Sequence, residues 1–102
     1  MPQPDAATLD LPAVLHALGD PVRLDLVRAL ATVGELTCAP AGMDVPKSTL
    51  SNHWRILREA GLTVTVRDGR HRRMSLRRDD LEERFPGLLT LILGGAPVAA
   101  GK

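Results

Sequence analysis

The chain has 102 residues, of which 44% are hydrophobic and 25% are charged, and its formal net charge is +1. These values are typical of one soluble globular domain. There is no continuous apolar run of 18 residues and no signal-peptide pattern at the start, so we expect a cytoplasmic protein without a membrane partner. The single cysteine, Cys38, cannot form an internal disulfide, which agrees with a reducing compartment.

The beginning of the chain predicts a short tail and then a helix. Residues 1–8 include two prolines and offer little to bury, so we expect a flexible tail there, followed by a folded domain over residues 9–93. Apolar residues then recur at helical spacing until Gly19, which ends the helix. These apolar residues are Leu11, Val14, Leu15 and Leu18.

A second helix is predicted over residues 21–33. Asp20 can cap its exposed amide groups, and Pro21 fits the first helical position. Its inward-facing residues are expected to be Val22, Leu26, Val27 and Leu30. The stretch that follows, residues 35–46, is less regular, because Pro40 and Gly42 would shorten or distort any helix there.

Residues 45–62 predict a helix with two different faces. Leu50, Trp54 and Leu57 fall on one side at i, i+4, i+7 spacing, which indicates a buried stripe, and His53 lies beside them. The opposite side carries short hydrogen-bonding groups and an arginine that suit DNA base edges and phosphates. These residues are Ser48, Ser51, Asn52, Arg55 and Glu59. From this helix alone, a purely solvated face would fit equally well.

A β-hairpin is predicted directly after this helix. Gly61 can end the helix, residues 62–67 alternate in a pattern that suits a strand, and Asp68 and Gly69 indicate a turn before a second strand over residues 70–76. The tip of this hairpin would be crowded with Arg67, Arg70, His71 and Arg72.

The register of the hairpin depends on the length of its loop. A two-residue loop would set Val64 opposite Arg73, whereas a three-residue loop over 68–70 would set Val64 opposite Met74 and Leu62 opposite Leu76. The second arrangement gives the hairpin one apolar side. We therefore predict the three-residue loop.

The end of the chain predicts two helical segments and a tail. Residues 77–85 resemble a helix start with acidic residues in the first turn, and Pro86 would interrupt it. Residues 86–93 are too apolar all round for a solvent-facing helix, so they must be buried in the core of the same chain or against a second copy. Residues 94–102 are expected to be a flexible tail.

Charge is unevenly distributed along the chain. Residues 1–46 carry a net charge of −4, and residues 79–102 carry −2. Residues 47–78 hold nine basic and two acidic side chains, a net charge of +7. A basic region on an otherwise acidic chain indicates binding to a polyanion.

Three stretches resemble the ArsR-type winged helix-turn-helix repressors of bacteria. Residues 15–30, 47–62 and 67–76 are similar to that family's amino-terminal signature, recognition helix and wing, and the resemblance spans residues 9–93. It implies a mainly α fold with a small β-hairpin and a homodimer formed through the amino- and carboxy-terminal helices. The implied dimer-interface residues are Leu11, Val14, Leu15, Leu88, Leu89, Leu91 and Ile92.

The resemblance also implies a sequence-specific regulator, in this family a repressor, that binds an inverted repeat in double-stranded DNA. Base-edge contacts are assigned to Ser48, Ser51, Asn52 and Arg55, and phosphate contacts to Lys47 and Thr49. The expected wing residues, which would contact the DNA backbone or enter the minor groove, are Arg67, Arg70, His71, Arg72 and Arg73.

Metal-responsive relatives use motifs that this chain lacks. Their Cys-x-Cys pair has no counterpart, because Leu36 and Pro40 flank Cys38 at the required spacing. No histidine follows residue 78, so the zinc ligands of the carboxy-terminal helix are missing too, and we expect no metal or cofactor. Cys38 is then either a buried inert residue or a redox sensor.

Two other functional classes compete with DNA binding. The sequence has no Gly-x-Ser-x-Gly elbow, His-Glu-x-x-His pair, phosphate-binding glycine loop or Cys-x-x-Cys motif, so we do not expect an enzyme. A winged helix used for protein docking would leave the concentrated arginines without a partner. No small-molecule effector is identified by the sequence.

Overall fold

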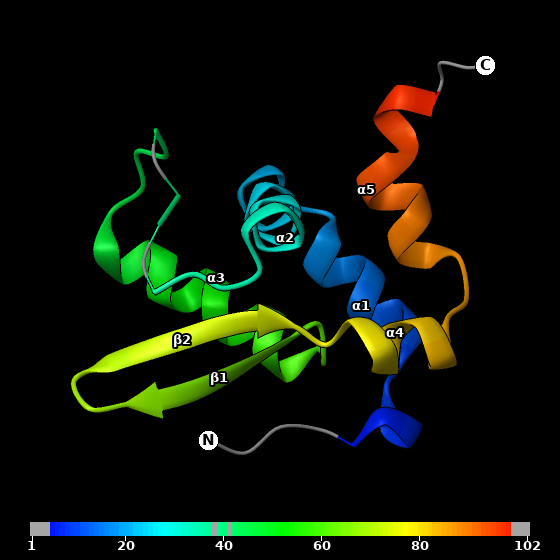
Figure 1. Ribbon diagram of the computed structural model, residues 1–102, viewed down its shortest axis with the longest axis horizontal. Coiled ribbons are helices and arrows are strands. Elements are labelled where there is room, and N and C mark those ends of the chain that lie inside the picture. Colours follow the sequence, from blue (N-terminus) through cyan, green and yellow to red (C-terminus); the bar gives the residue numbers. More distant parts are fainter. Residues whose placement is uncertain (1–4, 38, 41, 99–102) are drawn as a thin grey trace.

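The computed structural model describes residues 5–37, 39–40 and 42–98. It contains helices and one antiparallel hairpin, so the predicted fold class of a mainly α winged helix-turn-helix domain is confirmed (Figure 1). The hairpin lies along α3, and α5 stands at the opposite end of the molecule from the hairpin tip (Figure 1). The elements in order are η1 (Ala6–Thr8), α1 (Leu11–Leu18), α2 (Pro21–Val33), α3 (Lys47–Glu59), β1 (Thr63–Asp68), β2 (His71–Leu76), α4 (Arg78–Arg84) and α5 (Leu88–Val98).

The first two helices begin at aspartate caps. The Asp10 carboxylate accepts the amide hydrogen of Ala13 at 3.0 Å. The Asp20 carboxylate accepts from the amides of Val22 and Arg23 at 2.9 and 3.1 Å. Since these groups would otherwise lack partners, the caps fix where each helix starts. The predicted bounds of α2 are confirmed.

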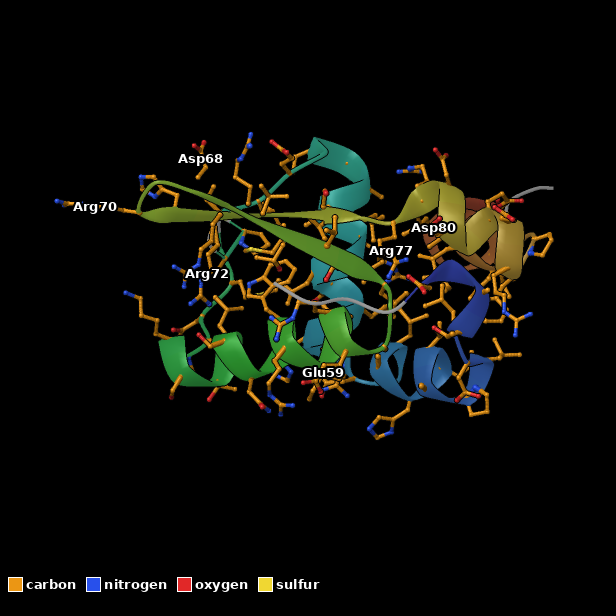
Figure 2. All side chains as sticks on the ribbon, turned by 90° about the horizontal axis from the view of Figure 1, so that it is seen from below. Glu59, Asp68, Arg70, Arg72, Arg77 and Asp80 are labelled. Carbon is orange, nitrogen blue, oxygen red and sulfur yellow. The ribbon has the colours of Figure 1, made fainter. Side chains whose placement is uncertain are left out.

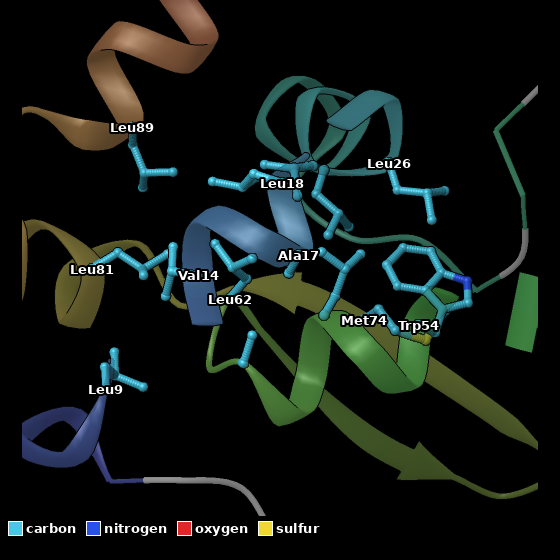
Figure 3. Packing of buried hydrophobic residues seen from close by; sticks show 14 of the residues in the cluster. Leu9, Val14, Ala17, Leu18, Leu26, Trp54, Leu62, Met74, Leu81 and Leu89 are labelled. Atoms are coloured by element: carbon cyan, nitrogen blue, oxygen red, sulfur yellow. The ribbon is translucent and has the colours of Figure 1, made fainter. Parts of the chain in front are cut away.

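One hydrophobic core connects every helix and the hairpin (Figure 3). The stripe of α3, Leu50, Trp54 and Leu57, is buried as predicted, and it packs with side chains from α1 and α2. The core members at 2% exposure or less are Leu9, Val14, Ala17, Leu26, Val27, Leu30, Leu57, Leu62 and Leu81. This core determines which face of α3 is left outside.

The junction between α3 and β1 requires a glycine. Gly61 has φ +88°, a left-handed conformation that side chains rarely adopt. A Cβ at this position would collide with the Leu9 side chain. The predicted left-handed end of the helix is therefore present, and it also brings the amino-terminal segment into the core.

Helical elements extend beyond residues 9 and 93, the limits that we predicted for the folded domain. Residues 6–8 form a 3-10 turn that contacts α4, and α5 continues to Val98. The predictions for residues 1–4 and 99–102 lie outside the described residues.

The predicted hairpin register is wrong. Val64 pairs with Ser75 and Thr65 with Met74, and only Gly69 and Arg70 form the loop. Gly69 has φ +64° and no other loop residue has a positive φ, so glycine occupies the first central position of a type II′ turn. We had treated Asp68 as a loop residue, whereas it pairs with His71 and ends β1.

This register changes the two faces of the hairpin. Thr63 and Thr65, rather than the valines, share the buried face with Met74. Val64 and Val66 lie on the other face, and Val66 is 46% exposed. The hairpin therefore lacks the single apolar side that we predicted.

The segment before α3 is tied to the hairpin. Leu36 and Met74 exchange two backbone hydrogen bonds of 3.0 and 2.8 Å. The segment around Leu36 therefore pairs with β2 at Met74, in the half of the strand farther from the hairpin tip. The sequence predicted a helix shortened or distorted by Pro40 and Gly42 in residues 35–46, whereas the described part of this stretch contains no helix. Cys38 lies outside the described residues, and so does its predicted redox role.

Candidate nucleic-acid interface

The outer face of α3 is polar and exposed. The division predicted from the sequence, a buried stripe opposite a polar face, is confirmed by the exposure of the side chains. All six predicted contact residues of this helix are exposed: Lys47, Ser48, Thr49, Ser51, Asn52 and Arg55. They start at the first turn, where free amide groups and the helix dipole favour a phosphate.

Three of the polar residues on α3 bind one another. Arg55 Nη2 donates to Asn52 Oδ1 at 2.6 Å, and Arg55 Nη1 pairs with Glu59 Oε1 at 3.0 Å. The network is exposed, so water and salt weaken it. A contact of Asn52 Oδ1 or of the Arg55 guanidinium with a base edge would compete with these bonds.

Sequence reasoning missed the residue that anchors α3 from behind. The guanidinium of Arg23 in α2 is buried; its Nε donates to the carbonyl of Ala17 at 2.7 Å, and its Nη1 lies 3.2 Å from Nδ1 of His53. Because a guanidinium can only donate, His53 Nδ1 must accept, which places the ring hydrogen on Nε2. The sequence did contain a signal for the burial of Arg23. Leu26 and Leu30 follow it by three and seven residues, so Arg23 lies on the same inward side of α2.

The hairpin tip is cationic. The neighbouring arginines Arg72 and Arg73, which we predicted to act alike, lie on opposite faces of the hairpin. Arg70 extends away from the tip, and Arg72 lies on the side that faces α3 (Figure 2). Arg67 and His71 are exposed beside them. Arg73 instead lies on the opposite face, where it pairs at 3.7 Å with both Glu35 and Asp68.

The two residues after β2 add less to the basic surface than the sequence suggests. The Arg77 side chain is only 7% exposed and forms a double contact with Asp80, through Nη2 at 3.0 Å and Nε at 3.1 Å (Figure 2). Arg78 donates to the carbonyl of Ala31 at 3.4 Å. The cations free to face a polyanion are therefore concentrated on α3 and the hairpin tip.

Side chains from α3 and from the hairpin tip meet around one hollow. It lies between the two elements and is lined from both. Its charged and polar lining includes Lys47, Ser51, Arg58, Arg70, His71 and Arg72. From α3, Lys47 in the first turn and Ser51 on the polar face thus meet the arginine-rich tip around this hollow, whereas Ser48, Asn52 and Arg55 lie outside its lining.

A second surface, on α1 and α5, is apolar. Leu11, Leu15 and Leu91 are 41%, 50% and 72% exposed. Leu88 and Ile92 are half-buried, and with Leu15 and Leu91 they line a groove of about 380 Å³. The predicted interface residues Val14 and Leu89 are instead buried in the core of the same chain, at 0% and 4% exposure.

Within residues 5–37, 39–40 and 42–98, no three His, Cys, Asp or Glu side chains are grouped so that they could hold a metal ion. No helix in the same part of the chain has the length and apolar character needed to cross a membrane.

Known proteins share this architecture. The family model described as a helix-turn-helix domain matches residues 18–67. An uncharacterized HTH-type transcriptional regulator of Bacillus subtilis (strain 168), YceK, is 42% identical over 79 residues, which cover 74% of this chain and 79% of YceK.

Two crystal structures resemble the fold. One is an ArsR family transcriptional regulator, with a TM-score of 0.64 and 20% identity over 90% of this chain and 92% of that chain. The other is a "possible transcriptional regulator for arsenical resistance", with a TM-score of 0.63 and 29% identity over 88% and 98%.

An exposed polar helix beside a basic hairpin defines a winged helix-turn-helix domain. Together with the relatives, these features show that the chain belongs to the ArsR-type helix-turn-helix transcriptional regulators. DNA binding and regulation of transcription are the properties of that class.

Proposed function

We propose that this protein is a cytoplasmic, homodimeric repressor that binds an inverted repeat in double-stranded DNA. The observation that carries the proposal is the exposed row of small polar side chains on α3 beside the cationic tip of the hairpin. A helix of this kind fits the major groove, and an adjoining cationic tip can reach the sugar–phosphate backbone. Occupation of a promoter would then block transcription.

Residue roles follow from chemistry and position. Asn52 can pair with adenine and Arg55 with guanine, while Ser48 and Ser51 suit either kind of edge. Lys47 and Thr49 lie in the first turn of α3, and this position supports the proposed phosphate contacts. On the wing, Arg67, Arg70, His71 and Arg72 supply affinity rather than sequence choice. Arg73 is the wing residue least suited to contact DNA, because the carboxylates of Glu35 and Asp68 already pair with it.

The apolar surface of α1 and α5 supports the homodimer. Five of the seven predicted interface residues remain available: Leu11, Leu15, Leu88, Leu91 and Ile92. Exposed leucines at adjoining positions on two helices favour burial against a second copy. Two copies related by a two-fold axis would present their α3 helices to successive major grooves, roughly 34 Å apart.

Selection of binding sites from random duplex DNA at two salt concentrations tests the proposal. We expect an enriched inverted repeat, with log affinity falling by about 0.9 per phosphate contact for each unit of log salt. A matched selection with Leu15→Asp and Leu91→Asp protein should lose the repeat and retain at most single half-sites. Failure to enrich any duplex sequence would contradict sequence-specific binding.

A further inference from the structure

The hollow between α3 and the hairpin is deep enough to be a cavity in its own right. Its volume is about 390 Å³, within the range that holds small molecules. The deep part is lined by buried side chains: Leu50, Trp54, Thr65 and Met74, each at most 9% exposed.

The rim has the opposite character. Lys47, Arg70 and Arg72 are exposed there, and Arg58 is half-buried. Among the residues that the structure describes, no Asp or Glu lines the cavity. A molecule that enters must therefore pass cations, and a negative group on it would be stabilised by charge-assisted hydrogen bonds.

One donor at the cavity has no partner among the described residues. Trp54 is 8% exposed, and its buried indole Nε1–H donates to no acceptor in the part of the chain that the structure describes. The indole nitrogen lies at the margin of the hydrophobic cluster, turned away from Ala17 and Leu62 (Figure 3). A buried unpaired N–H costs roughly 1–3 kcal/mol, so an acceptor brought by a ligand would remove a real penalty.

We propose that this cavity binds a small organic carboxylate with an apolar body and a second hydrogen-bond acceptor. The carboxylate lies among the rim arginines, the apolar body covers the Trp54 ring and Met74, and the acceptor takes the indole hydrogen. Because the rim is shared with the DNA-facing surface, the bound ligand excludes DNA. This exclusion rests on the proposed function, whereas binding of the ligand does not.

The chain offers a specific reporter for the test. Trp54 is its only tryptophan, so a proton–nitrogen NMR spectrum contains one indole N–H signal. We would titrate DNA-free protein with 4-methoxyphenylacetate, which carries a carboxylate, a ring and an ether acceptor. The comparison probes are its neutral amide, 4-methoxyphenylacetamide, and inorganic phosphate, which lacks an apolar body.

We expect a saturable shift of the indole signal with the carboxylate, and binding of the amide at least tenfold weaker. Arg58→Ala should weaken carboxylate binding about tenfold, since Arg58 lines the rim. Arg55→Ala is the matched control, because Arg55 lies on the same helix outside the cavity and should bind the carboxylate as the native protein does. Equal binding of the amide, or an equal response to phosphate, would overturn the proposed ligand class.

A second arm measures duplex binding with the cavity saturated. We expect at least a tenfold loss of DNA affinity relative to the ligand-free protein. Undiminished affinity would overturn the exclusion. The two proposals fail separately: duplex binding without any indole shift removes the cavity site, and an indole shift in a protein that binds no duplex removes the regulator.

Discussion

Arg23 Nη1 lies 3.2 Å from Nδ1 of His53, and this contact joins the buried side of α2 to the recognition helix α3. The same guanidinium donates to the backbone of Ala17 at the end of α1. One side chain therefore sets the relative positions of three helices. Its charge is buried, so it is stabilising only while those acceptors stay in place.

Replacing Arg23 by alanine should destabilise the fold by about 3 kcal/mol, because buried acceptors on α1 and α3 lose their donor. Arg28→Ala is the matched control: it removes an arginine of the same helix that is exposed and bonded to the Ile92 carbonyl at 3.2 Å. Urea denaturation compares them. Equal losses of stability would show that Arg23 has no special structural role.

Asp20 gives the protein a pH-dependent contribution to stability. The Arg23 amide lowers the pKa of this carboxyl group below its usual 3.8; partial burial opposes this shift, and the Arg23 charge, the Val22 amide and His53 add to it. A lowered folded-state pKa means that the contribution is fully present above pH 3.8 and is lost as the pH falls through the folded-state value. The Asp20→Asn protein keeps an acceptor without this titration. Its stability deficit relative to the native protein should therefore shrink in acid; a deficit that is constant between neutral pH and pH 3 would contradict the assignment.

Gly61→Ala should be severe, on the order of 2–4 kcal/mol, because left-handed strain is combined with a collision against Leu9. Gly69→Ala separates the two causes. Gly69 has a positive φ but no atom within 4 Å of an added Cβ, so only strain of about 1 kcal/mol is expected. Thermal unfolding of both variants measures the difference. Similar melting temperatures would mean that the Leu9 contact is unimportant.

Arg72 and Arg73 are neighbours that should differ in DNA binding. Arg72→Ala should weaken all duplexes alike and reduce the salt slope by about 1, because Arg72 lies on the face shared with α3. Arg73→Ala should change affinity less, since Arg73 lies on the far face with Glu35 and Asp68. Affinities measured at several salt concentrations decide between them, and the reverse order would mean that the wing docks with its other face.

Asn52→Ala should relax base preference at one position in each half-site, at a cost on the order of 1–3 kcal/mol for the preferred operator. It should leave affinity for unrelated duplexes nearly unchanged. Competition binding with single-base operator variants measures the effect. A uniform loss on every sequence would assign Asn52 to the DNA backbone instead.

Local signals predicted most of the helices. Aspartate caps and Gly34 set the limits of α2, and the spacing of Leu50, Trp54 and Leu57 identified the buried side of α3, because both patterns depend on nearby residues only. The polar face was identified in the same way. These features are enough to indicate the class of protein.

The misses have physical causes. Asp68 and Gly69 fit two turn types, and a shift of the loop by one residue exchanges the faces of the β1 side chains relative to those of β2, which is why Thr65 and not Val64 lies opposite Met74. Arg72 and Arg73 alternate along β2 in either register, so the alternation of the strand already places them on opposite faces. Small residues after position 93 suggested a tail, yet α5 continues to Val98. Helical spacing places Arg23 on the inward side of α2, but its contact with His53 spans 30 positions, so no local pattern could identify that partner.

The backbone pair of Leu36 and Met74 determines how much of the hairpin extends freely from the domain. It fixes β2 at Met74, so only three residue pairs lie between this point and the loop: Val66 with Arg73, Arg67 with Arg72, and Asp68 with His71. Inserting two residues into each strand there would advance the tip by roughly 7 Å while keeping every side chain on its present face. Inserting one in each would turn the tip residues over instead. Wing length is thus adjustable in steps of two, independently of the domain that carries it.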